Sequence, residues 1–153
     1  MEPSEILLHQ LFQTVRIISK CINKSLEPYG LYSSEWSILT TLKEKGPITQ
    51  GALASYLNIE PPAVSRTLAN LEKKGLATRT SGTDKREKKV SLSEEALKQY
   101  PHWLKVSGHH RQAVLASLSM EEQSELTALL KTIFNNAQQF EETVGTNCSN
   151  YKS

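Results

Sequence analysis

Residues 49–92 read TQGALASYLNIEPPAVSRTLANLEKKGLATRTSGTDKREKKVSL, and the spacing of their apolar residues changes along the stretch. The spacing is helical at first, and it predicts a short helix over 50–57 with Thr49 as its N-cap. A second helix is expected over 61–74, because prolines are tolerated in a first helical turn and Gly75 suits the position after a helix end. The two helices and the tight turn between them predict a helix-turn-helix.

The apolar spacing then becomes alternating, which is typical of β-strands. Residues 76–80 and 88–92 form two short alternating runs, and the polar, charged segment 81–87 joins them. This arrangement predicts a two-stranded hairpin with a long tip directly after the helix-turn-helix. The expected fold class is therefore mostly α with a small β hairpin, a winged helix-turn-helix.

Amphipathic helices are predicted on both sides of this region. The expected organisation is terminal helices over 4–30 and 119–142, a winged helix-turn-helix region over 34–92, a connecting helix over 93–118 and a disordered tail over 143–153. Pro101 and Gly108 are expected to bend or interrupt the connecting helix. Ser119 and Glu122 have the spacing of a capping box, which predicts where the last helix begins.

The composition is that of a globular protein. Of the 153 residues, 38% are hydrophobic and 22% are charged, which is ordinary for one folded domain and unlike a disordered chain. The longest unbroken apolar run covers only residues 113–116, so no segment is expected to span a membrane. Acidic residues stand near the start, where a secretion signal would be basic, and the chain is expected in the cytoplasm.

Positive charge is concentrated in the centre of the chain. Residues 59–92 hold eight basic and four acidic side chains, whereas residues 1–58 are neutral overall and residues 93–153 carry a net charge of −2. An excess of this kind suggests a polyanionic partner. Small polar side chains and one arginine on the outer face of 61–74 suit base edges in the major groove. The cations of the hairpin tip suit phosphates and the minor groove.

The predicted partner is therefore double-stranded DNA. The expected DNA-contacting residues are Thr49, Gln50, Pro62, Ala63, Ser65, Arg66, Thr67, Asn70, Arg79, Thr83, Asp84, Lys85, Arg86 and Lys88. Glu60 precedes the second helix and would repel phosphate if it were exposed there.

Three stretches resemble the multiple-antibiotic-resistance regulator (MarR) family. Residues 84–93, DKREKKVSLS, fit the family's wing signature D-x-R-x-x-x-V-x-L-[ST]. Residues 50–80, QGALASYLNIEPPAVSRTLANLEKKGLATRT, resemble the family's helix-turn-helix, and residues 118–133, LSMEEQSELTALLKTI, resemble its last helix. The likeness extends over residues 5 to 142, which is nearly the whole chain.

The resemblance implies a homodimeric, DNA-binding transcriptional regulator. Arg86 would enter the minor groove, Asp84 would hold the wing, and the dimerisation helices 4–30 and 119–142 would interlock with those of a second copy. The apolar faces of these helices also exceed what one small lobe can cover. The expected dimer contacts are Leu7, Leu8, Leu11, Val15, Leu130, Ile133, Phe134, Ala137 and Phe140.

The resemblance also implies a mode of regulation. The expected DNA partner is a pseudo-palindromic operator, and the expected ligand is a small phenolic or lipophilic effector that binds between the dimerisation and DNA-binding regions. The predicted function is that of a repressor released by this effector, which would favour a dimer whose recognition helices are wrongly spaced for consecutive major grooves.

Two other functions are open at this point. One is a winged-helix protein-interaction module that does not bind DNA, against which the basic wing argues. The other is a small metal-dependent enzyme, but no nucleophile or ligand set is found, so we expect no catalytic residue, no metal site and no cofactor. His109 and His110 are adjacent and point in different directions from a helix. Cys21 is expected to be a buried structural thiol.

Overall fold

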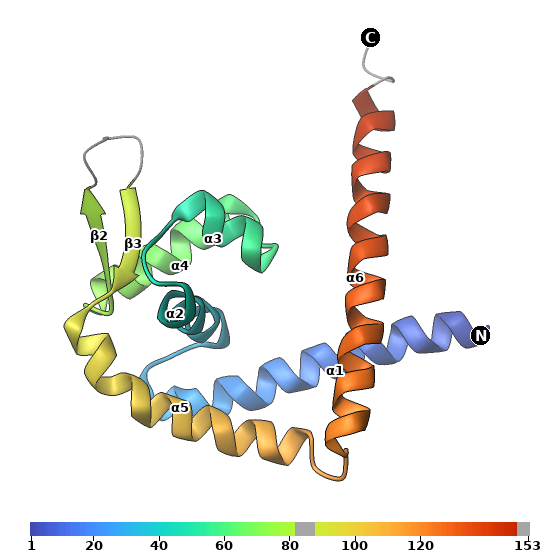
Figure 1. Cartoon of the computed structure of the whole chain (residues 1–153), viewed down its shortest axis with the longest axis horizontal. Helices are drawn as coiled ribbons and strands as arrows, with labels where there is room; N and C mark the ends of the chain where they lie inside the picture. Colours follow the sequence, from blue (N-terminus) through green and yellow to red (C-terminus); the bar gives the residue numbers. More distant parts are fainter. Residues whose placement is uncertain (82–87, 150–153) are drawn as a thin grey trace. The chain divides into compact units, whose positions relative to one another are not determined.

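The computed structural model describes residues 1–81 and 88–149, in two compact units, Met1–Val114 and Leu115–Ser153. The first unit contains α1 (Pro3–Leu26), the 3-10 turn η1 (Glu27–Tyr29), α2 (Ser33–Lys45), β1 (Ile48–Thr49), α3 (Gln50–Leu57), α4 (Pro61–Lys73), β2 (Ala77–Ser81), β3 (Lys88–Leu92) and α5 (Glu94–Val114) (Figure 1). The second contains α6 (Met120–Ser149). Within the described ranges, no helix combines the length and apolar character needed to cross a membrane.

The helix-turn-helix consists of α3 and α4, as the sequence predicts. The Thr49 hydroxyl accepts a hydrogen bond of 3.2 Å from Ala52 N, so Thr49 is the N-cap of α3. Asn58 has a left-handed conformation with φ of 52°, which turns the chain before Pro61 begins α4. Gly75 follows α4 with φ of 71°, the left-handed conformation that glycine favours after a helix end.

The wing belongs to a three-stranded antiparallel sheet in the order β1-β3-β2. β2 pairs with β3 from Ala77 opposite Leu92 to Ser81 opposite Lys88, which confirms the predicted hairpin. β1 adds the third strand and places Ile48 opposite Val90. β1 is not predicted from the sequence, because two residues are too few to show an alternating pattern.

One hydrophobic core holds the first unit together. Its largest contributors are Leu26, Leu31, Ile38, Leu39, Leu42, Leu53, Val64, Leu68, Leu71, Leu76, Val90, Tyr100 and Trp103. The ring of Trp36 lies 5.3 Å from that of Tyr100, so α2 packs on α5 through an aromatic contact. α1 and α5 also lie side by side (Figure 1). The core buries one stripe of α4, and the remaining faces of that helix lie outside the core.

α5 differs from the predicted connecting helix in two ways. It ends at Val114 instead of residue 118, and it runs through Pro101 and Gly108 without interruption. Pro101 is exposed, and the hydrogen bond that it removes is the one to the carbonyl of Leu97, a residue that is itself 47% exposed. Water can therefore serve the carbonyl that the proline leaves without a backbone donor, and the helix continues.

The second unit consists of α6 and the turn that precedes it. Ser119 N donates to the Glu122 carboxylate at 2.8 Å and Glu122 N donates to the Ser119 hydroxyl at 3.1 Å, which confirms the predicted capping box. Because α6 continues to Ser149, the prediction of a disordered tail is wrong for residues 143–149. Val144 continues the apolar spacing of Phe140, which favours this extension. Residues 150–153 lie outside the described part of the chain.

Candidate nucleic-acid interface

The outer face of α4 is polar and accessible. Among the expected DNA contacts on this helix, Pro62, Arg66 and Asn70 are exposed, and Ala63, Ser65 and Thr67 are half-buried. The Thr67 hydroxyl donates to the Ala63 carbonyl at 3.0 Å, which leaves its oxygen as an acceptor. Arg66 forms no ion pair with another described residue, so its guanidinium can turn toward a partner outside the chain.

Three of the expected DNA contacts bond to one another beside α4. Arg79 Nε donates to Glu72 Oε1 at 2.6 Å, and a terminal nitrogen of the same guanidinium donates to Gln50 Oε1 at 3.3 Å. The Gln50 amide donates in turn to the Ser65 hydroxyl. Glu72 is not predicted from the sequence, because a helix end and a turn separate it from Arg79 and no helical spacing rule pairs the two. Only the folded wing brings them together.

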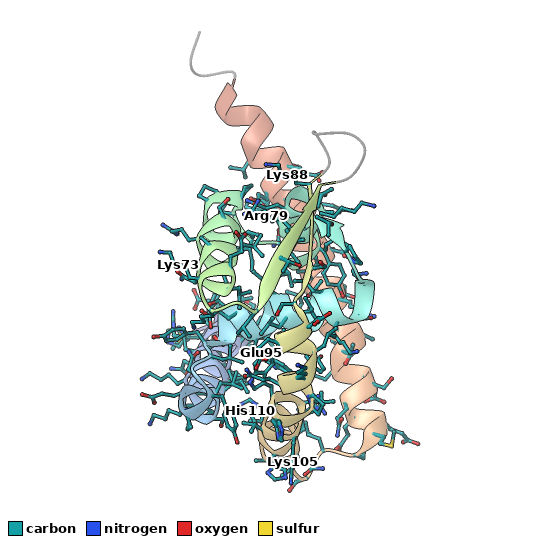
Figure 2. All side chains as sticks on the ribbon, turned by 90° about the vertical axis from the view of Figure 1, so that its left-hand side faces the viewer. Lys73, Arg79, Lys88, Glu95, Lys105 and His110 are labelled. Carbon is teal, nitrogen blue, oxygen red and sulfur yellow. The ribbon has the colours of Figure 1, made fainter. Side chains whose placement is uncertain are left out.

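The wing contributes further basic side chains. Lys88 is exposed at the start of β3. Figure 2 shows Lys73, Arg79 and Lys88 on α4, β2 and β3, while Glu95, Lys105 and His110 follow the course of α5. The other expected wing contacts lie outside the described residues: Thr83, Asp84, Lys85 and Arg86.

The structure divides the central cations into paired and available ones. The Lys74 ammonium donates to both oxygens of Glu35 at 2.8 Å and to Gly30 O at 2.7 Å, and Glu35 is only 2% exposed. Lys74 is therefore part of the fold and not of the interface. Within the described part of the chain, four central cations form no ion pair: Arg66, Lys73, Lys88 and Lys89.

One acidic side chain stands at the entrance of α4. Glu60 is the N-cap residue of this helix, it is exposed, and its side chain makes no cap hydrogen bond. A carboxylate at this point opposes a phosphate next to the first turn. Among the described residues, the unpaired cations therefore lie further along α4, at Arg66 and Lys73, and in the wing, at Lys88 and Lys89.

The residues considered for redox or metal chemistry are dispersed. In the described ranges, no three His, Cys, Asp or Glu side chains are placed to hold a metal ion. Cys21 is a free thiol and is half-buried, so the prediction of a buried thiol is wrong. The reason is its position in α1, a helix that buries fully only its last residue, Leu26.

The helices at the two ends of the chain expose apolar side chains. In α1, Leu7 is 58% exposed, and in α6, Phe134 is 45% and Phe140 is 70% exposed. Among the expected dimer contacts, Leu11 and Ile133 are half-buried and the others are exposed. One face of α6 repeats at alternating steps of four and three residues, the spacing of helices that pack in a coiled coil: Leu126, Leu130, Ile133, Ala137, Phe140 and Val144. Exposed apolar surface of this kind is typical of protein interfaces.

Known proteins are similar to this chain in sequence and in fold. The model of the MarR family matches residues 31–88. The uncharacterized HTH-type transcriptional regulator YwoH of Bacillus subtilis (strain 168) is 52% identical over 94 residues, which are 61% of this chain and 69% of YwoH.

Solved structures share the fold over most of the chain. A MarR transcriptional regulator from Methanosarcina mazei Go1 is 25% identical, with a TM-score of 0.78 over 92% of this chain and 94% of that chain. The organohalide-sensing transcriptional regulator RdhR-CbdbA1625, in its 2,4-dichlorophenol-bound form, is 28% identical, with a TM-score of 0.79 over 89% of this chain and 82% of that chain. The three-stranded winged-helix arrangement is thus that of known regulators.

Proposed function

The chain belongs to the MarR family, and we propose that it is a DNA-binding transcriptional regulator that reads DNA with α4 and the wing. The observation that carries this proposal is the accessible polar face of α4, on which Arg66 has no acidic partner among the described residues. The second helix of a helix-turn-helix lies in the major groove, where an arginine can bind guanine through two hydrogen bonds. The family is one of regulators and not of enzymes.

The regulator acts as a homodimer on a pseudo-palindromic operator in the cytoplasm. Support for the dimer comes from the apolar faces of α1 and α6, which two copies can cover by symmetric packing. Two recognition helices related by a twofold axis then meet half-sites that are about 34 Å apart, one turn of the double helix. Each copy contributes one α4 and one wing, so an operator with inverted symmetry fits the pair.

The regulator represses transcription, and a small phenolic or lipophilic molecule releases it. The form of RdhR-CbdbA1625 with bound 2,4-dichlorophenol supports this part of the proposal, because that ligand is a phenol. Such an effector acts by binding more tightly to a dimer whose two recognition helices have the wrong spacing for consecutive major grooves. The DNA-bound state then loses population.

Footprinting on the DNA that flanks the protein's own coding region tests the proposal. We expect a protected site with inverted symmetry, and we expect candidate phenols to weaken the protection. No protection on this DNA, together with no selection of any sequence from a random pool, would leave the winged-helix protein-interaction module as the better reading.

Two arginine substitutions separate the reading of bases from the binding of phosphates. Arg66→Ala should weaken operator binding by about 1–3 kcal/mol and relax the preference for one base pair in each half-site. Arg86→Ala should weaken binding as well, and if each copy loses one phosphate contact, the plot of log affinity against log salt should become shallower by roughly 0.9 per contact. Arg111→Ala is the matched control, since Arg111 is an exposed residue of α5 outside α4 and the wing. Equal losses from all three variants would mean that only net charge matters.

A further inference from the structure

The described residues of the first unit form two ion pairs, and the surroundings of these pairs differ. The Glu35–Lys74 pair is largely enclosed between α2 and the end of α4, with a Glu35 side chain that is almost completely buried. The Glu72–Arg79 pair lies at the surface, where both side chains are 36% exposed. The second pair also contacts Gln50, which the first does not. Figure 2 shows Arg79 in β2, next to α4.

The guanidinium of Arg79 joins three elements. Its Nε donates to Glu72 on α4, and a terminal nitrogen donates to Gln50 at the start of α3, while the residue itself belongs to β2. A planar group with donors in fixed directions holds two acceptors in one geometry, which the ammonium of a lysine does not. The Gln50 amide donates to the Ser65 hydroxyl, so one series of hydrogen bonds runs from Glu72 through Arg79 and Gln50 to Ser65.

The charge of Arg79 is compensated before any DNA is present. A phosphate would have to compete with a carboxylate whose oxygen lies 2.6 Å from Arg79 Nε. Glu72 itself repels phosphates, so an interface that relied on charge alone would bind DNA better without this acid. The negative charge of Glu72 does not explain why an acidic residue stands here, but the geometry of the neighbouring side chains does.

We infer that Glu72 and Arg79 are positioning residues of the DNA interface, which hold Gln50 and Ser65 in the orientation in which these side chains meet base edges. The inference rests on the proposed function. Side chains that are already held in place lose less freedom on binding, which raises the affinity for the correct sequence. Non-specific binding depends on phosphates and not on base edges, so it should not need the pair.

Two substitutions at one position separate this role from charge. Glu72→Gln removes the negative charge but keeps an oxygen that can accept from Arg79, whereas Glu72→Ala removes both. Fluorescence anisotropy measures binding to a duplex that wild-type protein has selected from a random-sequence pool, and to a scrambled duplex of the same length and composition. We expect Glu72→Ala to bind the selected duplex about tenfold more weakly and the scrambled duplex no more weakly than wild type. Glu72→Gln should stay close to wild type on both.

Arg79→Lys is an independent variant. It keeps the positive charge but loses the planar guanidinium that donates to both Glu72 and Gln50. We expect the same loss on the selected duplex as for Glu72→Ala, with an unchanged dependence of affinity on salt, because no phosphate contact is removed. The double variant Glu72→Ala with Arg79→Lys should bind no more weakly than either single variant, since both changes break one network. Thermal melting of each variant shows whether the fold persists.

Several results would overturn the inference. Tighter binding of both duplexes by both Glu72 variants would mean that the acid acts through charge alone. Equal losses on both duplexes would mean that the pair only supports the fold, and full wild-type selectivity in Glu72→Ala or in Arg79→Lys would show that the pair positions nothing. If wild-type protein selects no duplex at all, the proposed function itself fails, which is a distinguishable result because it does not involve the variants.

Discussion

The winged-helix region from α2 to β3 and the terminal helices α1 and α6 use similar apolar side chains but bury them very differently. Leu39, Leu53 and Leu68 have no exposed surface, whereas Leu7 and Phe140 are mostly exposed. The winged-helix region is therefore covered within one chain. The terminal helices carry apolar faces that, in our proposal, a second copy covers. Substitutions in the winged-helix region should therefore change the unfolding equilibrium, and substitutions on the apolar faces of the terminal helices should change the dimerisation equilibrium.

The largest effect is expected inside the winged-helix region. Leu68→Ala removes a fully buried side chain of α4 and leaves a cavity, so the free energy of unfolding should fall by about 2–5 kcal/mol, as measured by urea denaturation. Leu97→Ala, on the exposed side of α5, is the matched control and should cost much less. Similar losses for the two variants would contradict the placement of the core.

The next effect concerns the second copy. Ile133→Glu places a charge on the apolar face of α6, and it should raise the dissociation constant of the dimer by about a hundredfold or more, because the charge would be buried without a partner. Sedimentation equilibrium measures this constant. Asn135→Glu adds the same charge to the opposite face of α6, where Asn135 is exposed, and should leave the dimer nearly intact. An equal effect of both substitutions would place the interface elsewhere.

A smaller effect is expected where α2 meets the end of α4. Glu35 accepts from Lys74 and from Tyr32 N at 3.1 Å, so Glu35→Gln removes the charge that Lys74 needs. The expected loss is about 1–3 kcal/mol of unfolding free energy, because Lys74 is partly exposed and keeps its bond to Gly30 O. Glu44→Gln, at an exposed position of the same helix, is the control for urea denaturation. No difference between the variants would show that this pair does not stabilise the fold.

The smallest effect is expected at the cap of α3. Thr49→Ala removes one hydrogen bond to Ala52 N and should lower the free energy of unfolding by about 1 kcal/mol, whereas Thr49→Ser should restore it. Thermal or urea denaturation of the two variants measures this difference in the free energy of unfolding. If Thr49→Ser is no more stable than Thr49→Ala, the hydroxyl does not stabilise α3 as its cap.

The sequence predicts those elements whose signals are local. Apolar spacing, Thr49 and Gly75 mark α3 and α4, and the Ser119–Glu122 box marks the start of α6. The extension of α6 to Ser149 is not predicted from the sequence. A polar tail that contains a glycine is typical of the region after a helix end, although the apolar spacing continues.

The parts of the site that the sequence does not predict depend on tertiary contacts. Glu35 and Lys74 are 39 residues apart, and Arg79 and Gln50 are 29 residues apart, so no spacing rule pairs them. β1 exists only because β3 offers it a partner. The expected DNA contacts on α4, in contrast, follow from which of its positions the core leaves outside.

The mass of wild-type protein in solution, alone and on its selected duplex, tests most directly whether a second copy covers the apolar faces of the terminal helices. Sedimentation velocity at micromolar concentration should give a species of twice 17.1 kDa, and two chains should bind one duplex. A species of 17.1 kDa that binds DNA as a single chain would contradict the division of the molecule into a self-contained winged-helix region and helices that need a partner.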